Sequence, residues 1–196
     1  MTEGSKRVQG RPRSPENDRA ILSAVKTMLA EEGFEALRFD ALARVSGVSR
    51  PSIYRRWASK AELLNDVAYG RKWDMPTALV PGDLRATIRN ILEHVAAYYS
   101  RPEMRAAVLG AMASLPSAAA APCDLAIEAE KETRAAVAAM VADAKAAGLM
   151  RQEVEADSLY ELMMGSVIYR TVFSYRRIAG DIPDDLVDTI IDGLKA

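Results

Sequence analysis

Apolar residues recur every three or four positions along most of the chain, which is the spacing of one face of an α-helix. Helix-start residues such as Ser, Asp and Pro, together with helix-stop glycines, divide this pattern into separate segments. The segments predict helices over residues 14–33, 40–47, 49–57, 59–73, 83–100, 102–115, 124–149, 155–176 and 183–194. The sequence therefore predicts an all-α protein of about nine helices.

A break in the helical pattern divides the chain into two parts. Residues 74–82 (DMPTALVPG) hold two prolines and one glycine, which interrupt helices. Before the break we expect a three-helix head with a linking helix over residues 14–73, and after it a larger helical body over residues 83–196. Residues 1–13 are polar and basic, so we expect a disordered arm there.

Residues 40–60 (DALARVSGVSRPSIYRRWASK) predict two short helices joined by a sharp turn. Gly47 stands where the first helix must stop, because glycine adopts the left-handed conformation without a Cβ clash. Ser49 is placed to cap the next helix with its hydroxyl group, and Pro51 falls in the first turn. Ile53 faces inward, and the rest of the surface carries arginine, serine and tyrosine. This is the layout of a helix-turn-helix, although a plain helical hairpin with a polar face is an alternative.

The same stretch resembles the DNA-binding segment of the TetR family of bacterial transcriptional regulators. Two positions depart from the family's pattern: Arg38 stands where a capping Thr is common, and Pro51 where a small residue is common. The resemblance covers about a quarter of the chain, residues 17–65. It rests on Leu42-Ala43, Gly47-Val48-Ser49, Ile53-Tyr54, Trp57, Ser59-Lys60, Leu63 and Leu64.

The resemblance implies that residues 49–57 form a recognition helix for duplex DNA. The N-terminal part of such a helix points into the major groove, so base contacts are expected there and phosphate contacts around it. Two of these contacts have alternatives: the basic arm could be a solvated tail that does not contact DNA, and Lys60 could be an exposed side chain that does not contact phosphate. The expected base contacts are Arg50, Pro51 and Ser52. The expected phosphate contacts are Ser49, Tyr54, Arg55, Arg56, Lys60, Arg11 and Arg13.

The net charge of −1 conceals an uneven distribution. Residues 1–60 hold 12 Lys and Arg against 7 Asp and Glu, whereas residues 61–196 hold 14 against 20. This suits a DNA-contacting head on an acidic body, although chance unevenness would look the same. A single cysteine excludes an internal disulfide and fits a cytoplasmic location. The basic N-terminus does not resemble a secretory signal, and no apolar run is long enough to span a membrane.

Residues 155–176 carry two apolar stripes, where a surface helix of a monomer normally carries one. The first comprises Leu159, Leu162, Met163, Ser166 and Phe173, and the second Met164, Ile168, Val172 and Tyr175. We expect the second stripe to join the last helix in a four-helix dimer interface, as in TetR-like regulators. The alternative is that it faces the protein's own central helices. The predicted interface is Met164, Gly165, Ile168, Val172, Tyr175, Leu186, Ile190, Ile191 and Leu194.

The sequence predicts no catalytic group, metal site or cofactor. His94 and Cys123 are the only histidine and cysteine, and we expect His94 in the core or in a pocket wall. No phosphate-binding glycine loop occurs. Nine methionines favour an adaptable apolar cavity for a small-molecule effector, although methionine often only fills a core. The candidate lining residues are Tyr98, Met104, Met112, Met140, Met163 and Tyr169.

These features together predict a ligand-responsive repressor that binds a palindromic DNA operator as a homodimer and is not an enzyme. By resemblance, an effector would shift the dimer away from the head spacing that fits DNA. One alternative is an all-helical ligand-binding protein or enzyme without specific DNA binding. Another is a non-specific architectural DNA binder, which the near-zero net charge disfavours because such binding depends on counterion release.

Overall fold

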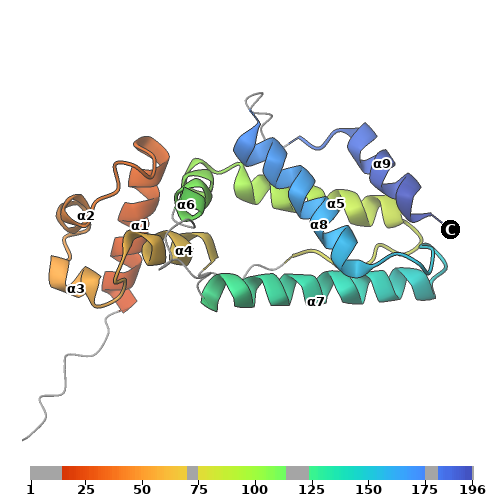
Figure 1. Cartoon of the computed structure of the whole chain (residues 1–196), viewed down its shortest axis with the longest axis horizontal. Coiled ribbons are helices and arrows are strands. Elements are labelled where there is room, and N and C mark those ends of the chain that lie inside the picture. Colours follow the sequence, from red (N-terminus) through yellow and green to blue (C-terminus); the bar gives the residue numbers. More distant parts are fainter. Residues whose placement is uncertain (1–14, 70–74, 114–123, 175–180, 196) are drawn as a thin grey trace, which may run out of the picture.

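The computed structural model describes residues 15–69, 75–113, 124–174 and 181–195, and within these ranges the fold is all-helical, as predicted. The molecule is elongated, with α1 to α4 at one end and α5, α7, α8 and α9 at the other (Figure 1). The described elements are α1 (Pro15–Glu31), α2 (Phe39–Ser46), α3 (Arg50–Tyr54), α4 (Lys60–Tyr69), α5 (Leu84–Tyr99), α6 (Pro102–Ala113), α7 (Asp124–Ala146), α8 (Ala156–Ile168), the π-helical turn η1 (Tyr169–Phe173) and α9 (Asp184–Leu194).

The head is built around α1, which packs against α2 and α4. Each helix of the head contributes an almost fully buried aliphatic side chain to one hydrophobic cluster: Ile21 from α1, Leu42 from α2, Ile53 from α3 and Leu63 from α4. Full burial of such a side chain contributes about 1.5–3 kcal/mol to stability. The cluster therefore fixes the inner side of the short helix α3.

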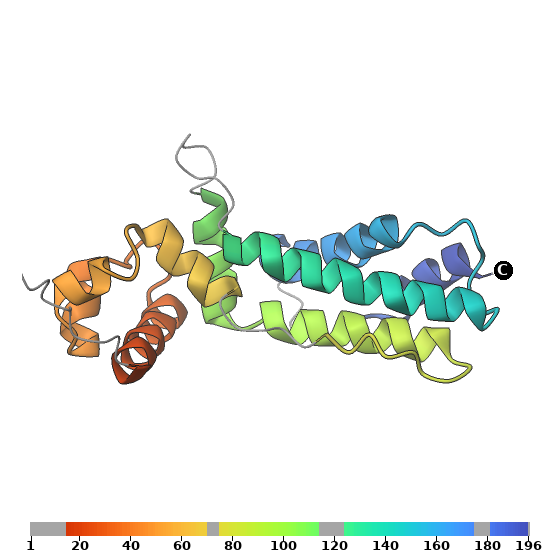
Figure 2. The same ribbon diagram turned by 90° about the horizontal axis from the view of Figure 1, so that it is seen from below.

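Helix α6 follows α5 in the chain but packs against the head. It contacts both α1 and α4, and Met104 and Ala107 lie in the head's hydrophobic cluster. At Gly110 a Cβ atom would lie 2.7 Å from Leu64 Cδ1 and 3.0 Å from Phe34 Cβ. Glycine therefore permits the close approach of α6, which lies between the two ends of the molecule (Figures 1 and 2).

The body consists of helices that run along the long axis, with α7 extending along most of its length (Figure 2). Helix α8 packs against α5 and α7, and α9 packs against α5. Asp83 caps α5 as predicted, since its Oδ1 accepts a hydrogen bond from the Ala86 N–H at 2.8 Å. The buried face of α5, which includes Ile88, Leu92 and Val95, forms the centre of the body core.

Ion pairs fasten α9 to α5 at the surface. Arg85 donates to Asp188 at 2.7 Å and to Asp184 at 2.8 Å. Arg89 also pairs with Asp184. The hydrogen bonds from Arg85 hold the pKa of both carboxyl groups below the usual value for aspartate.

The predicted helix over residues 155–176 is divided in the structure. The regular α-helix ends at Ile168, and the Ser174 N–H then donates to the Tyr169 carbonyl, five residues back, at 2.8 Å. This is a π-type hydrogen bond, which widens the last turn. Thr171 and Val172 are β-branched and fit a regular helix less well.

The two apolar stripes of α8 have roles that differ from the predicted ones. Met164 and Val172, predicted at a dimer interface, are buried in the chain's own core, as are Ile190, Ile191 and Leu194 of α9. For Met164 and Val172, this burial agrees with the alternative stated for the second stripe, that it faces the protein's own helices. Ile168 and Leu186 are partly buried against the same core, Gly165 is exposed, and Tyr175 lies outside the described residues.

The exposed apolar side chains of α8 and η1 include two members of the first stripe, whose other apolar members Leu159 and Met163 are buried, and Tyr169, which was in neither stripe. Leu162 and Phe173 are 52% and 49% exposed, and Tyr169 is 63% exposed. Ser166, at the same face of the helix, is only partly buried. Among the helices of the described ranges, none combines the length and apolar character needed to cross a bilayer.

Candidate nucleic-acid interface

The turn between α2 and α3 has the geometry that the sequence predicts. Gly47 ends α2 in the left-handed region, with φ of 68°. The Ser46 hydroxyl donates to the Leu42 carbonyl at 2.7 Å and accepts from the Val48 N–H at 3.3 Å. Val48 is buried, so its side chain fixes the angle between the two helices. Arg38, as expected, gives the start of α2 no side-chain cap.

The start of α3 differs from the prediction in one hydrogen bond. The Ser49 hydroxyl donates to the Ser52 hydroxyl at 3.0 Å and does not cap the helix. The Ser49 backbone carbonyl instead accepts the first helical bonds, from the N–H groups of Ser52 and Ile53. Pro51 lies in the first turn, as predicted. Ser52 stands only three residues from Ser49, so its hydroxyl competes with the helix N–H groups for the Ser49 hydroxyl.

Two buried residues anchor the inner side of α3 and the turn that follows it. Ile53 is fully buried. Trp57 is also buried, and its indole N–H donates to Asp66 Oδ2 of α4 at 2.8 Å. Regular helix ends at Tyr54, but the Arg56 and Trp57 N–H groups still donate to the Ile53 carbonyl. The segment after Gly47 is therefore a short rigid element with one face fixed to the head.

The opposite face of α3 is open to solvent. It presents Ser49, Arg50, Pro51, Tyr54 and Arg55, all exposed, and Ser52, partly buried. The Arg55 guanidinium donates to the Ser52 hydroxyl at 2.8 Å. The residues predicted to contact bases thus lie on the same surface as three of those predicted to contact phosphates. Such a surface offers hydrogen-bond donors that suit both base edges and phosphate oxygens.

Arg50 has a partner that sequence reasoning missed. Its guanidinium pairs with Asp40 of α2 at 2.6 Å and lies 5.8 Å from the centre of the Tyr54 ring. Tyr54 in turn packs edge-on against Phe39, with ring centres 4.7 Å apart. Both members of the ion pair are exposed. Asp40 therefore places a negative charge on the surface that would approach DNA.

Arg56, predicted to bind phosphate, serves the fold. Its side chain is only 11% exposed, forms an ion pair with Asp18 of α1 and donates to the Ser52 carbonyl at 3.0 Å. Asp18 holds the Arg56 guanidinium strongly, because breaking the pair would leave a mostly buried positive charge without its partner. Periodicity predicts Arg56 on the surface of a helix over residues 49–57, but regular helix ends at Tyr54 and the Arg56 side chain turns to Asp18 of α1.

The start of α4 carries the predicted capping box in a shifted form. The Glu62 N–H donates to the Ser59 hydroxyl at 3.1 Å, and the Glu62 carboxylate accepts from the Ala58 N–H at 2.8 Å. Lys60 follows at the positive end of the helix, with its ammonium 5.5 Å from the centre of the Phe34 ring. Arg11 and Arg13 of the arm lie outside the described residues.

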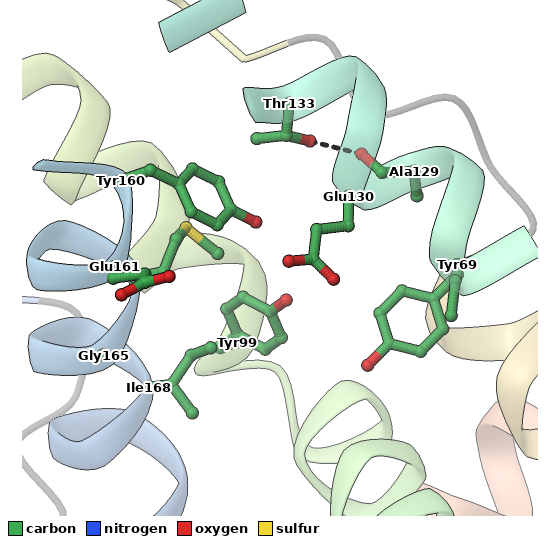
Figure 3. Close-up of a pocket in the computed structure, with 11 residues that line it drawn as sticks. Tyr69, Tyr99, Ala129, Glu130, Thr133, Tyr160, Glu161, Gly165 and Ile168 are labelled. Carbon is green, nitrogen blue, oxygen red and sulfur yellow. Dashed lines mark hydrogen bonds between the residues drawn. The ribbon is translucent and has the colours of Figure 1, made fainter. Parts of the chain in front are cut away.

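A cavity of about 360 Å³ lies where α4 meets the body helices α5, α7 and α8. Three tyrosines, two glutamates and several apolar side chains line it (Figure 3). The lining residues are Tyr69 of α4, Tyr99 of α5, Ala126, Ala129, Glu130 and Thr133 of α7, and Tyr160, Glu161, Met164, Gly165 and Ile168 of α8. Cavities of this volume hold small organic molecules.

The residues predicted for a ligand pocket lie elsewhere. Met112 and Tyr169 are exposed, Met104 belongs to the head's cluster, and Met140 and Met163 fill the body core. Tyr98 donates its hydroxyl to the Ala68 carbonyl at 2.7 Å, which links α5 to α4. Methionine is equally suited to core packing, so its presence did not locate the cavity. Tyr99 could have been found, because it extends the apolar stripe of α5 and a buried tyrosine needs a polar partner for its hydroxyl.

The electrostatics of the cavity centre on Arg134. Its guanidinium pairs with Glu130 at 2.9 Å, Asp157 at 3.0 Å and Glu161 at 3.3 Å, and lies 4.4 Å from the centre of the Tyr160 ring. Burial, and after it the charge of Glu130, raises the pKa of Tyr160. Burial also raises the pKa of Tyr99. Both hydroxyls are therefore neutral at physiological pH.

Other predicted features have no role in this cavity. His94, expected in a core or pocket wall, is exposed on α5, because it lies on the opposite side of that helix from its buried stripe. Cys123 lies outside the described residues. Within the part of the chain that the structure describes, His, Cys, Asp and Glu form no group that could hold a metal ion.

Two family models match the chain. The model described as "Bacterial regulatory proteins, tetR family" matches residues 21–67, which hold α2, α3 and most of α1 and α4. The model described as "Tetracyclin repressor-like, C-terminal domain" matches residues 81–190, more than half of the chain. The division between the two matches falls in the same non-helical region as the break in the sequence pattern.

Known proteins agree with these matches. An uncharacterized HTH-type transcriptional regulator of Bacillus subtilis (strain 168), YdeS, is 34% identical over 86 residues, which span 44% of this chain and 42% of that protein. The crystal structure of the TetR family transcription regulator SCO0332 is 28% identical, with a TM-score of 0.60 over 92% of this chain and 100% of that chain. The fatty acid degradation regulator FadR from Bacillus halodurans shares the fold, at 16% identity and a TM-score of 0.66 over 93% of this chain and 95% of that chain. The chain belongs to the TetR family of bacterial regulatory proteins.

Proposed function

We propose that this chain is a ligand-responsive transcriptional repressor that binds a palindromic DNA operator as a homodimer. The carrying observation is α3: a short helix fixed on one side by Ile53 and Trp57, with Arg50, Ser52 and Arg55 on its outer side. A helix held in this way keeps its side chains in one orientation when it enters the major groove.

We assign different tasks to the residues of this surface. Arg50, Pro51 and Ser52 lie at the N-terminal end of α3 and are proposed to contact bases. Ser49, Tyr54 and Arg55 are proposed to contact phosphates on either side of the groove.

Lys60 and the arm residues Arg11 and Arg13 are proposed as further phosphate contacts. Lys60 lies at the start of α4, where the helix dipole and free N–H groups also favour an anion. Arg56 has no place among these contacts, because its charge is held by Asp18.

Homodimerisation is proposed to use the exposed side of α8. Leu162 of α8 and Tyr169 and Phe173 of η1 would be covered by the same side of these elements in the partner. Gly165 borders this surface, and a Cβ atom there would meet nothing within 4 Å, so the position leaves room for a second backbone. An isologous contact of this kind gives the two-fold symmetry that a palindromic operator requires.

Helix α4 is proposed to couple the effector cavity to the DNA surface. Its C-terminal residue Tyr69 lines the cavity, and its N-terminal residue Lys60 is separated from the end of α3 by the short segment 55–59. The bond between Tyr98 and the Ala68 carbonyl ties the same end of α4 to α5. A ligand that displaces Tyr69 would therefore tilt α4 and change the spacing of the two heads in a dimer.

A genomic footprint of the purified chain tests this function. We expect protection of a small number of two-fold symmetric sites, with each half covered by one head, and loss of protection when the effector is added. Protection spread evenly over the genome would favour the architectural alternative, and no protection even at low ionic strength would remove DNA binding from the proposal.

A further inference from the structure

The cavity between α4, α5, α7 and α8 has an excess of negative charge. Three carboxylates, from Glu130, Asp157 and Glu161, share the single guanidinium of Arg134. Two of the three, Glu130 and Glu161, belong to the lining itself. No described lining residue is basic. The two lining carboxylates therefore leave about one negative charge beyond what Arg134 neutralises, and Asp157, next to Arg134 but outside the lining, adds another.

The same wall carries aromatic rings. Tyr69, Tyr99 and Tyr160 come from three different helices, and the Glu130 carboxylate extends into the space between them (Figure 3). Tyrosine rings attract cations through their faces. Arg134 demonstrates this locally, because its own guanidinium lies 4.4 Å from the centre of the Tyr160 ring while it pairs with the glutamates.

The rest of the lining is apolar. Ala126, Ala129, Met164 and Ile168 present only hydrocarbon or thioether surface to the cavity. A ligand that fits this wall needs an apolar body next to its charge. An inorganic cation would leave the apolar part of the 360 Å³ cavity without a partner.

We propose that this cavity binds an apolar organic cation, with its charged group near Glu130 and the tyrosine rings and its apolar part against Met164 and Ile168. This proposal depends on the proposed function in one respect: it assumes that the cavity is the effector site. Anionic ligands are disfavoured by the same carboxylates, and the charge of one of them, Glu130, also raises the pKa of Tyr160 after the effect of burial.

Equilibrium dialysis of the full chain against three probes of similar size tests the charge preference. The probes are benzyltrimethylammonium, its neutral isostere neopentylbenzene and the anion 3-phenylpropanoate. We expect the cation to bind about tenfold or more tightly than either other probe, and its affinity to fall as salt is added. Equal or tighter binding of the neutral or anionic probe would overturn the proposal, as would no binding of the cation at millimolar concentration.

A matched pair of variants locates the site. Glu130→Gln keeps the size of the side chain and removes one charge, and should weaken cation binding about tenfold with little effect on the neutral probe. Glu128→Gln makes the same change two residues away on α7, at an exposed position outside the lining, and should leave cation binding unchanged. Equal losses in both variants, or no loss in Glu130→Gln, would contradict the assignment. Circular dichroism of each variant checks that α7 is intact.

DNA binding is measured separately, so the two proposals can fail independently. Cation binding without any change in operator affinity would leave the ligand class standing and remove the effector role of the cavity. Operator release by a neutral or anionic compound that binds here, with no binding of the cation, would leave the effector role of the cavity standing and remove the proposed ligand class.

Discussion

The basic residues around α3 divide into those whose charge is used within the fold and those that remain available at the surface. Arg56 pairs with Asp18 and is mostly covered by α1. Arg55 is exposed, and its guanidinium donates to the Ser52 hydroxyl, a hydrogen bond that a phosphate could replace. The sequence places the two arginines next to each other, and the ion pair of Arg56 with Asp18 of α1 separates their roles.

Substitution of Arg55 should affect all DNA sequences equally. Arg55→Ala removes one proposed phosphate contact, so the affinity for operator and for random duplex should fall together, and the slope of log K against log salt should decrease by about 1. Fluorescence anisotropy titrations at several salt concentrations measure both quantities. Arg151→Ala, which removes an exposed arginine at the far end of the body, is the control and should change neither.

Asp40 should limit the affinity for non-operator DNA. Its carboxylate pairs with Arg50 at 2.6 Å, on the surface that is proposed to approach DNA. Asp40→Asn should tighten binding to random duplex about threefold to tenfold, the size of a surface charge interaction of roughly 1 kcal/mol. Asp143→Asn, at an exposed position on α7, makes the same change away from the head. Unchanged or weaker binding of random duplex by Asp40→Asn would show that this carboxylate does not repel DNA.

Local sequence signals predicted the residues whose conformation depends on near neighbours. Gly47 was identified because a helix stop requires a left-handed residue, and the structure has it at φ of 68°. Ser59 was identified as a cap for the same local reason, and Glu62 donates its N–H to it. The Asp40–Arg50 and Asp18–Arg56 pairs join residues on different helices, and no local pattern specifies them.

Among the elements, α6 connects the head and the body most closely. The missing side chain at Gly110 lets α6 approach Leu64 of α4 and Phe34. Helical periodicity assigned α6 to the body because of its position in the chain. Its contact with the head depends on packing between distant segments, which periodicity does not describe.

A larger residue at position 110 should therefore separate α6 from the head. Gly110→Val should destabilise the fold by roughly 1–3 kcal/mol through overpacking. Ala113→Val places a similar side chain at an exposed position of the same helix and should cost less than about 1 kcal/mol. Denaturant unfolding followed by tryptophan fluorescence measures both. If the two variants unfolded at the same denaturant concentration, the close approach at Gly110 would not contribute to stability.

For α8, the sequence correctly indicated two apolar sides, but it assigned the dimer contact to the side with Met164, which the structure buries. The first stripe is divided in the structure: Leu159 and Met163 are buried, whereas Leu162 and Phe173 are exposed. Periodicity shows that Leu162 and Met164 lie on different sides of the helix. It cannot show which side meets α5 and α7, because both neighbours come from distant parts of the chain. The structure leaves Leu162 exposed and buries Met164.

A charge at the centre of the exposed side should separate the dimer. Leu162→Glu should convert the chain to a monomer in multi-angle light scattering and weaken operator binding, because a buried unpaired carboxylate at the interface is costly. The matched control is Ile127→Glu, at another exposed apolar position, on α7, which should remain dimeric. A wild-type chain that is already monomeric at micromolar concentration would exclude this interface.

In the whole molecule, a single helix connects the two proposed sites. The first residues of α4 follow α3 and its last residue, Tyr69, lines the cavity. Because both ends belong to one helix, ligand binding at Tyr69 in the body could change the position of the head without a long chain of contacts between the two sites. The sequence predicted a linking helix here, but it could not predict that α4 itself forms part of the cavity wall.

The central claim is that α3 reads base pairs in the major groove, and binding-site selection from a random duplex library tests it most directly. Wild-type chain should select one two-fold symmetric site. Arg50→Ala should select the same site with discrimination lost at one base position in each half, by roughly 1–3 kcal/mol. A uniform loss of affinity across all sequences for Arg50→Ala, with the base preferences unchanged, would contradict the claim.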